Sequence, residues 1–199
     1  GASIGNAYGM ELALGEKAYG DIVGVIGDST FMHSGITGLL DIVYNKGAST
    51  IVILDNRITA MTGHQENPTT GKTLMGEDTV QINLAELSKS LGVNSVRVVD
   101  PYNLEETKNT IEEELEKDEI SVVVARRACA LLKSVERKKP FKVDPDKCRD
   151  CGMCLEIGCP ALSKGDGQSV IDDYLCTGCG VCVQVCPFDA IVKDGGSDE

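Results

Sequence analysis

The sequence predicts an α/β domain built on a parallel sheet, followed by a small α+β domain that metal–thiolate bonds hold together. Over the first 130 residues, continuous apolar strand patterns alternate with helical patterns, which is typical of a parallel sheet covered on both faces. Eight of the nine cysteines lie in the last 52 residues, where apolar residues are few, so a hydrophobic core alone would hardly stabilise this part. We therefore predict domains at residues 1–133 and 145–199, joined by a linker of mixed charge at 134–144.

Each element of the first domain has its own local signal. The first helix has apolar residues at helical spacing, and the first strand is a β-rich run that ends at Gly27 and Asp28. Gly47 is a typical C-cap for the second helix, and Asn83 is a plausible N-cap for the third. The other strands are apolar runs, and the fourth helix carries acidic residues on its solvated face. The predicted helices are residues 4–14, 34–47, 83–92 and 103–118, and the predicted strands are 21–28, 49–56, 95–100 and 120–127.

Composition and charge exclude several classes of protein. The chain is 42% hydrophobic and 25% charged, as globular proteins are, and its net charge of −12 argues against a nucleic-acid partner. No apolar run approaches the roughly 20 residues needed to span a bilayer, and the N-terminus lacks a signal-peptide pattern. We therefore expect a cytoplasmic protein without a membrane partner. The glycine-rich start without an initiator Met predicts a fragment of a longer chain or the product of a split gene.

The cysteines form two quasi-repeated runs, Cys148-x2-Cys151-x2-Cys154-x4-Cys159-Pro160 and Cys176-x2-Cys179-x2-Cys182-x3-Cys186-Pro187. The second spacing is the bacterial iron–sulfur signature, and zinc or disulfides are the alternatives. The runs resemble two-cluster bacterial-type ferredoxin domains, although the first has one extra residue before its last cysteine. That resemblance implies one [4Fe–4S] cluster on Cys148, Cys151, Cys154 and Cys186, and another on Cys176, Cys179, Cys182 and Cys159. Cys129 stands apart, and we interpret it as a small buried hydrophobe.

Asp28 and Asn56 follow two successive predicted strands. Because neighbouring parallel strands end at the same edge of a sheet, their oxygens can share one divalent cation, and Mg²⁺ commonly also binds phosphate oxygens. The residues after Asp28 begin a helix, whose free N–H groups favour an anion. The alternative is that Asp28 is only an N-cap and Asn56 only a turn residue. The long stretch from Asn56 to Asn83 lacks periodicity, and we interpret it as a functional loop.

The "GDS" and "LDN" segments resemble the thiamine diphosphate motif. The longer segments "GASIG", "VIGDSTFMHSGI" and "VILDNRITAMTGHQ" are similar to 2-oxoacid:ferredoxin oxidoreductases of the indolepyruvate type, whose domain order also agrees. The resemblance implies a Mg²⁺ ion held by Asp28, Asn56 and the backbone carbonyl of Ile58. It also implies that the backbone at Gly27, Ser29 and Thr30 contacts the diphosphate, with Thr62 and Gly63 near the thiazolium ring. Ser29 replaces the usual glycine of the motif.

The two histidines, His33 and His64, fall inside these motifs. Either could transfer a proton near the reacting carbon or hydrogen-bond the substrate carboxylate. The alternative for each is a histidine that merely packs beside the cofactor.

The resemblance implies oxidative decarboxylation of an aryl 2-oxoacid to an acyl-CoA, with single electrons passing through the two clusters to an external ferredoxin. The implied partners are the 2-oxoacid, coenzyme A, a pyrimidine-binding domain that supplies the cofactor-activating glutamate, and a beta subunit. Since that domain is not found in this sequence, we expect the chain to be inactive alone. Two alternatives remain open: a non-catalytic ferredoxin module fused to an α/β docking domain, and a pyruvate-type oxidoreductase.

Overall fold

The computed structural model describes residues 1–15 and 20–193. The chain divides into two compact units, the first over Gly1–Cys129 and the second from Ala130 onward. Within the described residues, every helix is too short or too polar to cross a lipid bilayer. Because the two units have separate cores, each is described by itself.

The first unit contains a four-stranded parallel sheet, which confirms the predicted fold class. The strand order is β1-β2-β4-β3, and every pair is parallel. The two central strands are apolar almost throughout, and nearly all of their side chains are buried, as expected for a sheet covered on both faces. The strands are β1 (Val23–Gly27), β2 (Thr50–Asp55), β3 (Ser95–Val99) and β4 (Ser121–Arg126).

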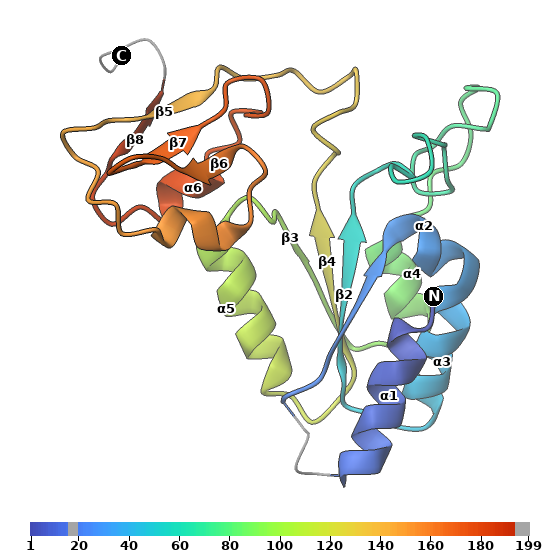
Figure 1. Ribbon diagram of the computed structural model, residues 1–199. Helices are drawn as coiled ribbons and strands as arrows, with labels where there is room; N and C mark the ends of the chain where they lie inside the picture. Colours follow the sequence, from blue (N-terminus) through green and yellow to red (C-terminus); the bar gives the residue numbers. More distant parts are fainter. Residues whose placement is uncertain (16–19, 194–199) are drawn as a thin grey trace. The chain divides into compact units, whose positions relative to one another are not determined.

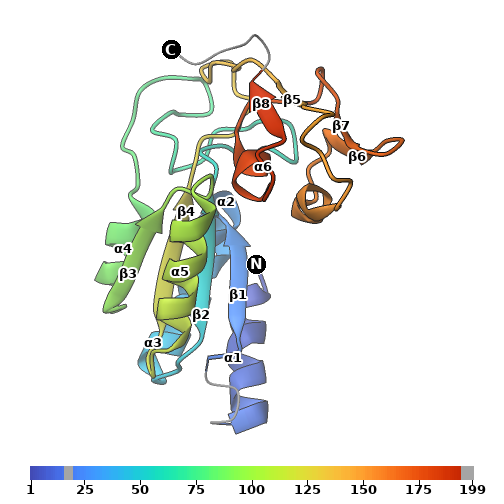
Figure 2. The same cartoon turned by 90° about the vertical axis from the view of Figure 1, so that its left-hand side faces the viewer.

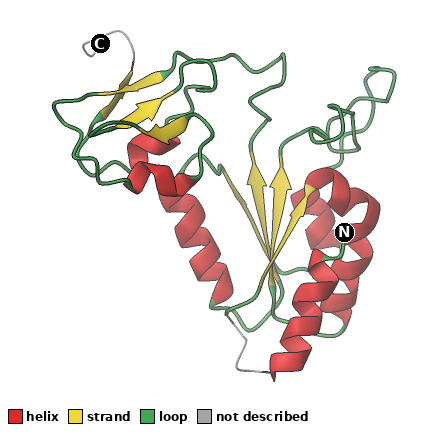
Figure 3. Cartoon of the chain, viewed as in Figure 1, coloured by secondary structure: helices red, strands yellow, loops and turns green. Residues whose placement is uncertain are grey.

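Helices cover both faces of this sheet (Figures 1 and 3). Figure 1 shows α1 (Ser3–Leu14), α3 (Ile36–Tyr44) and α4 (Leu84–Ser90) on one face, and α5 (Leu104–Leu115) on the other; the turned view in Figure 2 agrees. Alternate side chains of β2 point to opposite faces of the sheet. Ile51 and Ile53 belong to the larger core, with α1, α3 and α4, whereas Val52 belongs to the smaller core beside α5. The sheet therefore fixes both layers through its period of two.

The helix caps differ in part from the expectation. Asn83 caps α4 as predicted, because its side-chain oxygen accepts from the Ala85 N–H at 3.0 Å. The predicted C-cap role of Gly47 is wrong: α3 ends at Tyr44, and Lys46 takes the left-handed conformation, at φ 58°. Gly47 instead permits close packing, since a Cβ there would lie 2.7 Å from Ile42 Cγ2.

The helical segment after β1 begins earlier than predicted. Residues 28–44 run without a break through α2 (Asp28–Thr30), a π-helical turn η2 (Phe31–Gly35) and α3. A π-helical turn inserted into a helix is often found at functional sites. This one carries His33. The helix therefore starts directly at the aspartate that follows β1.

The second unit is small and α+β, as predicted. Two antiparallel pairs, β5 with β8 and β6 with β7, surround a core that includes Phe141, Ile191, Cys154 and Cys182. Strand β5 lies inside the range 134–144 that the sequence predicts as a linker. The elements are β5 (Phe141–Val143), η3 (Met153–Ile157), β6 (Leu162–Lys164), β7 (Ser169–Ile171), α6 (Val181–Gln184) and β8 (Ile191–Lys193).

A buried glutamate joins α1 to the loop before β2. Glu11 is 5% exposed and accepts from the Ala48 N–H at 2.8 Å and from Ser49 Oγ at 2.6 Å. Glu11→Ala would leave both donors buried without a partner, so we expect the free energy of unfolding to fall by about 2 kcal/mol or more. Urea denaturation followed by circular dichroism measures this. Glu105→Ala, at an exposed site in α5, should change it by less than about 1 kcal/mol; equal effects would contradict the role of Glu11.

Candidate functional site

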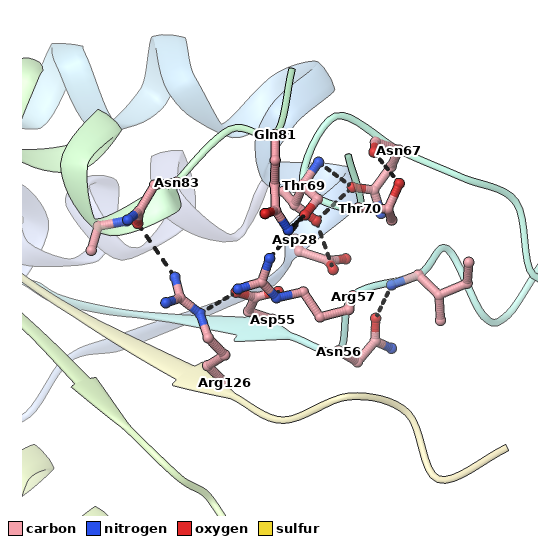
Figure 4. Close-up of polar contacts among 12 residues, drawn as sticks. Asp28, Asp55, Asn56, Arg57, Asn67, Thr69, Thr70, Gln81, Asn83 and Arg126 are labelled. Atoms are coloured by element: carbon pink, nitrogen blue, oxygen red, sulfur yellow. Dashed lines mark hydrogen bonds and ion pairs between the residues drawn. The ribbon is translucent and has the colours of Figure 1, made fainter. Parts of the chain in front are cut away.

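The candidate site lies at the carboxyl ends of β1 and β2 (Figure 4). The two strands are paired in parallel, with Gly27 of β1 opposite Leu54 of β2. Asp28 and Asn56 therefore emerge at the same edge of the sheet, as the sequence predicts. This edge is where open α/β sheets bind ligands.

Asp28 is a buried carboxylate. It is 3% exposed, its Oδ1 accepts from the Ser29 N–H at 2.6 Å, and its Oδ2 is 3.5 Å from Thr69 Oγ1. Burial raises the pKa of Asp28, as does the nearby charge of Asp55, while the Ser29 N–H is the main opposing influence. Among the described residues, no lysine or arginine forms an ion pair with this carboxylate. Its ionised form therefore lacks a compensating cation, which is what a divalent ion would supply.

Asp55, the residue before Asn56, has the compensation that Asp28 lacks. It is 1% exposed, and its two oxygens form ion pairs with Arg126 Nε at 2.7 Å and with Arg57 Nε at 3.4 Å. Arg126 also lies 3.4 Å from Asn83 Oδ1, through its Nη2. The side chain of Asp55 thus joins the ends of β2 and β4 to the loop that follows β2.

The loop after β2 turns sharply at Arg57, whose φ of 61° is in the left-handed region. Asn56 Oδ1 accepts from the Ile58 N–H at 3.1 Å, and the Asn56 carbonyl accepts from the Cys129 N–H at 2.9 Å. An amide oxygen has two lone pairs, so the bond to Ile58 leaves Asn56 Oδ1 capable of a second interaction. Ile58 itself is buried.

Asn67 and Thr69 belong to the site, although the sequence analysis did not identify them. Thr69 is fully buried; its N–H and Oγ1 donate to Asn67 Oδ1 at 2.9 and 2.7 Å. Its carbonyl accepts from Arg57 Nη1 at 3.0 Å and from Gln81 Nε2 at 2.9 Å. The signal available in the sequence was Asn-Pro-Thr, a typical start of an Asx turn. This turn places the Thr69 hydroxyl beside Asp28.

The other predicted site residues are more open. Ser29 and Thr30 are half-buried in the first helical turn, and Gly27 is its N-cap. His33 is exposed, and so are Thr62, Gly63 and His64, which form a turn closed by a 2.7 Å bond from Thr62 Oγ1 to Gln65 Oε1. The structure gives neither histidine a hydrogen bond within the described residues. Their catalytic roles remain predictions.

In the second unit, four cysteines line one pocket. Cys148, Cys151 and Cys154 of the first run meet Cys186 of the second there, beside Val143 and Ile191. Cys154 Sγ lies 3.2 Å from Ser169 Oγ, and the Ala190 N–H donates to Cys186 Sγ at 3.3 Å. This is the combination of three cysteines with one from the other run that the sequence analysis assigned to one cluster.

The other four cysteines are close enough for their charges to influence one another. Burial raises the pKa of Cys182 to about 11, and the charges of Cys179, Cys176 and Cys159 add to this effect. As free thiolates these four groups would repel one another, whereas iron ions would stabilise them in the deprotonated form. The residues present therefore fit iron–sulfur clusters.

The backbone around both runs repeats itself. Asp150 and Gly152 have φ values of 48° and 76°, and the equivalent Gly178 and Gly180 have 69° and 79°. Left-handed residues at alternate positions turn the chain tightly on either side of Cys151 and Cys179, as in other anion and iron–sulfur sites. The internal repeat seen in the sequence is thus also a repeat of conformation.

Comparisons with known families support both units. Residues 1–125 match the family described as "Thiamine pyrophosphate enzyme, C-terminal TPP binding domain". Residues 145–162 and 169–192 each match a "4Fe-4S binding domain". The first unit is therefore a thiamine diphosphate-binding domain, and the second carries two 4Fe–4S binding motifs.

Curated relatives match nearly the whole chain. Indolepyruvate oxidoreductase subunit IorA of Pyrococcus abyssi is 42% identical over 97% of this chain. The proteins with that name from Methanothermobacter marburgensis and Archaeoglobus fulgidus are 40% and 41% identical over 98% and 96%. The matched region is 33%, 31% and 31% of these relatives. The chain therefore spans about a third of the length of the curated relatives it matches.

A solved structure shares the fold. It is described as "2-oxoglutarate:ferredoxin oxidoreductase from Magnetococcus marinus with 2-oxoglutarate, coenzyme A and succinyl-CoA bound". It matches with a TM-score of 0.56 over 99% of this chain and 63% of that chain, at 14% sequence identity. At that identity the likeness shows the fold alone.

The burial of Asp28 should make the stability of the metal-free protein depend on pH. Because the pKa of Asp28 is raised in the folded state, the folded protein binds more protons than the unfolded chain between pH 3.8 and that raised pKa. The free energy of unfolding therefore falls as the pH rises through this interval, and the cost persists above it. We expect Asp28→Asn to stabilise the metal-free protein at pH 7 and to lose this advantage near pH 4, measured by urea denaturation at both values. Asp21→Asn, an exposed control before β1, should show no such difference between the two pH values. If Asp28→Asn also shows no difference, the argument is refuted.

Proposed function

Since the chain belongs to the thiamine pyrophosphate enzyme family through its C-terminal TPP-binding domain, we propose that it is the cofactor-binding and electron-transfer part of a 2-oxoacid:ferredoxin oxidoreductase. The proposed reaction is the oxidative decarboxylation of an aryl 2-oxoacid, indolepyruvate-like, to an acyl-CoA. The electrons leave through two clusters to an external ferredoxin. The observation that carries the proposal is the buried, uncompensated carboxylate of Asp28 at the carboxyl end of β1, in a chain that also brings together two groups of four cysteines.

The donor set at the sheet edge fits a magnesium–diphosphate complex. Asp28 supplies a carboxylate and Asn56 an amide oxygen, which are ligand types that Mg²⁺ binds. The first helical turn begins at Asp28, so the half-buried Ser29 and Thr30 present the backbone to the diphosphate. We assign the third protein ligand to the carbonyl of Ile58, in the loop that Arg57 turns. Thiamine diphosphate supplies the electron sink that decarboxylation requires.

We assign positioning roles to the protein residues around the proposed cofactor site. Thr69 Oγ1 approaches Asp28 Oδ2, which orients that carboxylate before any cation binds. The exposed turn at residues 62–64 is where Thr62 and Gly63 would meet the thiazolium ring. His64 in this turn and His33 in η2 are the candidate groups for proton transfer near the reacting carbon.

The relatives' names favour an aryl substrate. The three relatives described above are all named as indolepyruvate oxidoreductase subunits. We propose that the complete enzyme includes a pyrimidine-binding domain and a beta subunit outside this sequence, and that coenzyme A accepts the acyl group. The comparison of indolepyruvate with pyruvate as substrate, in the enzyme completed with these parts, decides between the aryl type and the pyruvate type.

Asn56→Ala tests the magnesium site. Removal of the amide oxygen should weaken Mg²⁺-dependent binding of thiamine diphosphate by about tenfold or more, because a divalent ion loses one of few protein ligands. Isothermal titration calorimetry on the complete enzyme measures the affinity with and without Mg²⁺. Asn109→Ala, an exposed site on α5, is the matched control. If both variants bind the cofactor as the wild type does, the chain is an electron carrier without a thiamine site at these residues.

Single cysteine variants test the exchange of ligands between the two runs. A chain with two [4Fe–4S] clusters holds about eight iron atoms. Cys186→Ser and Cys159→Ser should each damage one cluster and leave the other, so that each lowers the iron content toward about four and changes a different electron paramagnetic resonance signal. Cys129→Ser, which lies in the first unit, should keep the full iron content. Loss of the same signal in both cluster variants would disprove the assignment.

A further inference from the structure

The second unit carries one group of consecutive basic residues, at Arg137, Lys138 and Lys139. All three are exposed, and within the described residues neither lysine forms an ion pair. Their surroundings are acidic: residues 140–199 contain 5 basic and 11 acidic side chains, and no lysine or arginine occurs between Lys164 and Lys193. This basic segment therefore contrasts with the excess of acidic side chains in residues 140–199.

The basic segment packs directly on the loop that carries the second cysteine run. Gly178 lies between Cys176 and Cys179, and a Cβ at this position would be 2.5 Å from the Lys139 carbonyl oxygen and 2.7 Å from Lys138 Cβ. The Arg137 guanidinium donates to the carbonyl of Tyr174, two residues before Cys176. The Arg137 guanidinium and the backbone of Lys138 and Lys139 thus lie beside the ligand loop of one cluster.

Exposed apolar side chains adjoin these charges. Tyr174 is 89% exposed and Leu175 is 53% exposed, and both directly precede Cys176. Their backbone N–H groups donate to Asp172 Oδ1 at 2.8 and 3.1 Å, so the turn that presents them is fixed. An exposed aromatic residue beside a charged rim is the composition of a small transient interface.

We propose that Arg137, Lys138, Lys139, Tyr174 and Leu175 form the docking surface for an acidic iron–sulfur carrier protein of the ferredoxin type, and that the cluster on Cys176, Cys179, Cys182 and Cys159 is the exit point for electrons. In the docked pair, one electron leaves the reduced cluster and reduces one [4Fe–4S]²⁺ cluster of the carrier to [4Fe–4S]⁺; no bond or proton is exchanged. The positive segment selects an acidic partner by charge complementarity, and Tyr174 supplies the apolar contact. The inference rests on the proposed function for the identity of the acceptor and for the direction of electron flow.

The first test is equilibrium binding, which needs no turnover. The oxidised complete enzyme is titrated calorimetrically at low ionic strength with an oxidised, recombinant, acidic two-cluster ferredoxin. The double variant Lys138→Glu/Lys139→Glu should raise the Kd about tenfold or more, and added salt should weaken binding in the wild type far more than in the variant. The matched control, Lys147→Glu/Lys164→Glu, makes the same change in net charge at two other exposed lysines of the second unit and should shift the Kd less than twofold.

The second test measures electron transfer without a 2-oxoacid. The clusters are reduced photochemically, and their oxidation by the ferredoxin is followed by stopped flow. The double variant should lower the second-order rate constant about tenfold or more at low ionic strength, while a small neutral quinone should oxidise variant and wild type alike. Tyr174→Ser should lower the rate at both low and high salt. The iron content of each variant shows whether a cluster has been lost. The milder pair Lys138→Gln/Lys139→Gln removes the two charges without reversing them and should give an intermediate effect on the rate.

Two results would overturn the proposal: equal effects of the two Lys→Glu double variants, or unchanged binding and rate in Lys138→Glu/Lys139→Glu. Because the reduction is photochemical, an enzyme that fails to oxidise any 2-oxoacid still gives a decisive answer about docking. Conversely, if the enzyme oxidises 2-oxoacids and Lys138→Glu/Lys139→Glu binds ferredoxin as the wild type does, the docking surface is rejected and the proposed function is not.

Discussion

The geometry of the candidate site depends on how two buried carboxylates at one sheet edge are compensated. Asp55 lies between Arg57 and Arg126. The described residues provide Asp28 with the Ser29 N–H as a donor and with the Thr69 hydroxyl at 3.5 Å, but with no cation. The charge of Asp55 also raises the pKa of Asp28, because like charges disfavour each other's ionisation. Two arginines lie at this edge of the sheet, and both pair with Asp55. Neither forms an ion pair with Asp28. That asymmetry is the physical reason to place a metal ion at Asp28.

The compensated carboxylate has a structural role in the same site. Arg126 comes from β4 and Arg57 from the loop after β2, so the ion pairs of Asp55 join segments that are far apart in the sequence. Arg57 also donates to the Thr69 carbonyl, and Thr69 in turn approaches Asp28. The chain of contacts from Asp55 through Arg57 to Thr69 therefore positions Asp28 and the Asn56 loop together. Buried pairs of this kind are costly to break, because the remaining charge is left without a partner.

The sequence predicts those parts of the fold that are determined by residues close together in the chain. The central strands read as apolar runs because both of their faces are buried, and Asn83 caps its helix through a bond two residues away. The contact of Thr69 with Asp28, 41 residues apart, has no local pattern, and neither does the approach of Arg126 to Asp55, 71 residues apart. At Gly47 the local rule failed because Lys46 takes the left-handed conformation and tertiary packing against Tyr8 of α1, 2.9 Å from where a Cβ would lie, requires the glycine. Tertiary contacts therefore add Thr69, Asp55 and Arg126 to the site residues that the sequence predicts.

Bound cofactors would stabilise the two units for different physical reasons. The first unit has a core of its own, with Phe31, Leu39, Ile51 and Val122 fully buried, so a cation at Asp28 would stabilise an already folded domain by mass action. In the second unit, Cys154 and Cys182 are themselves part of the small core, and few apolar side chains remain without them. Metal binding there contributes directly to folding, as in other small metal-containing domains. Loss of iron should consequently unfold the second unit, whereas loss of magnesium should leave the parallel sheet intact and change only its stability.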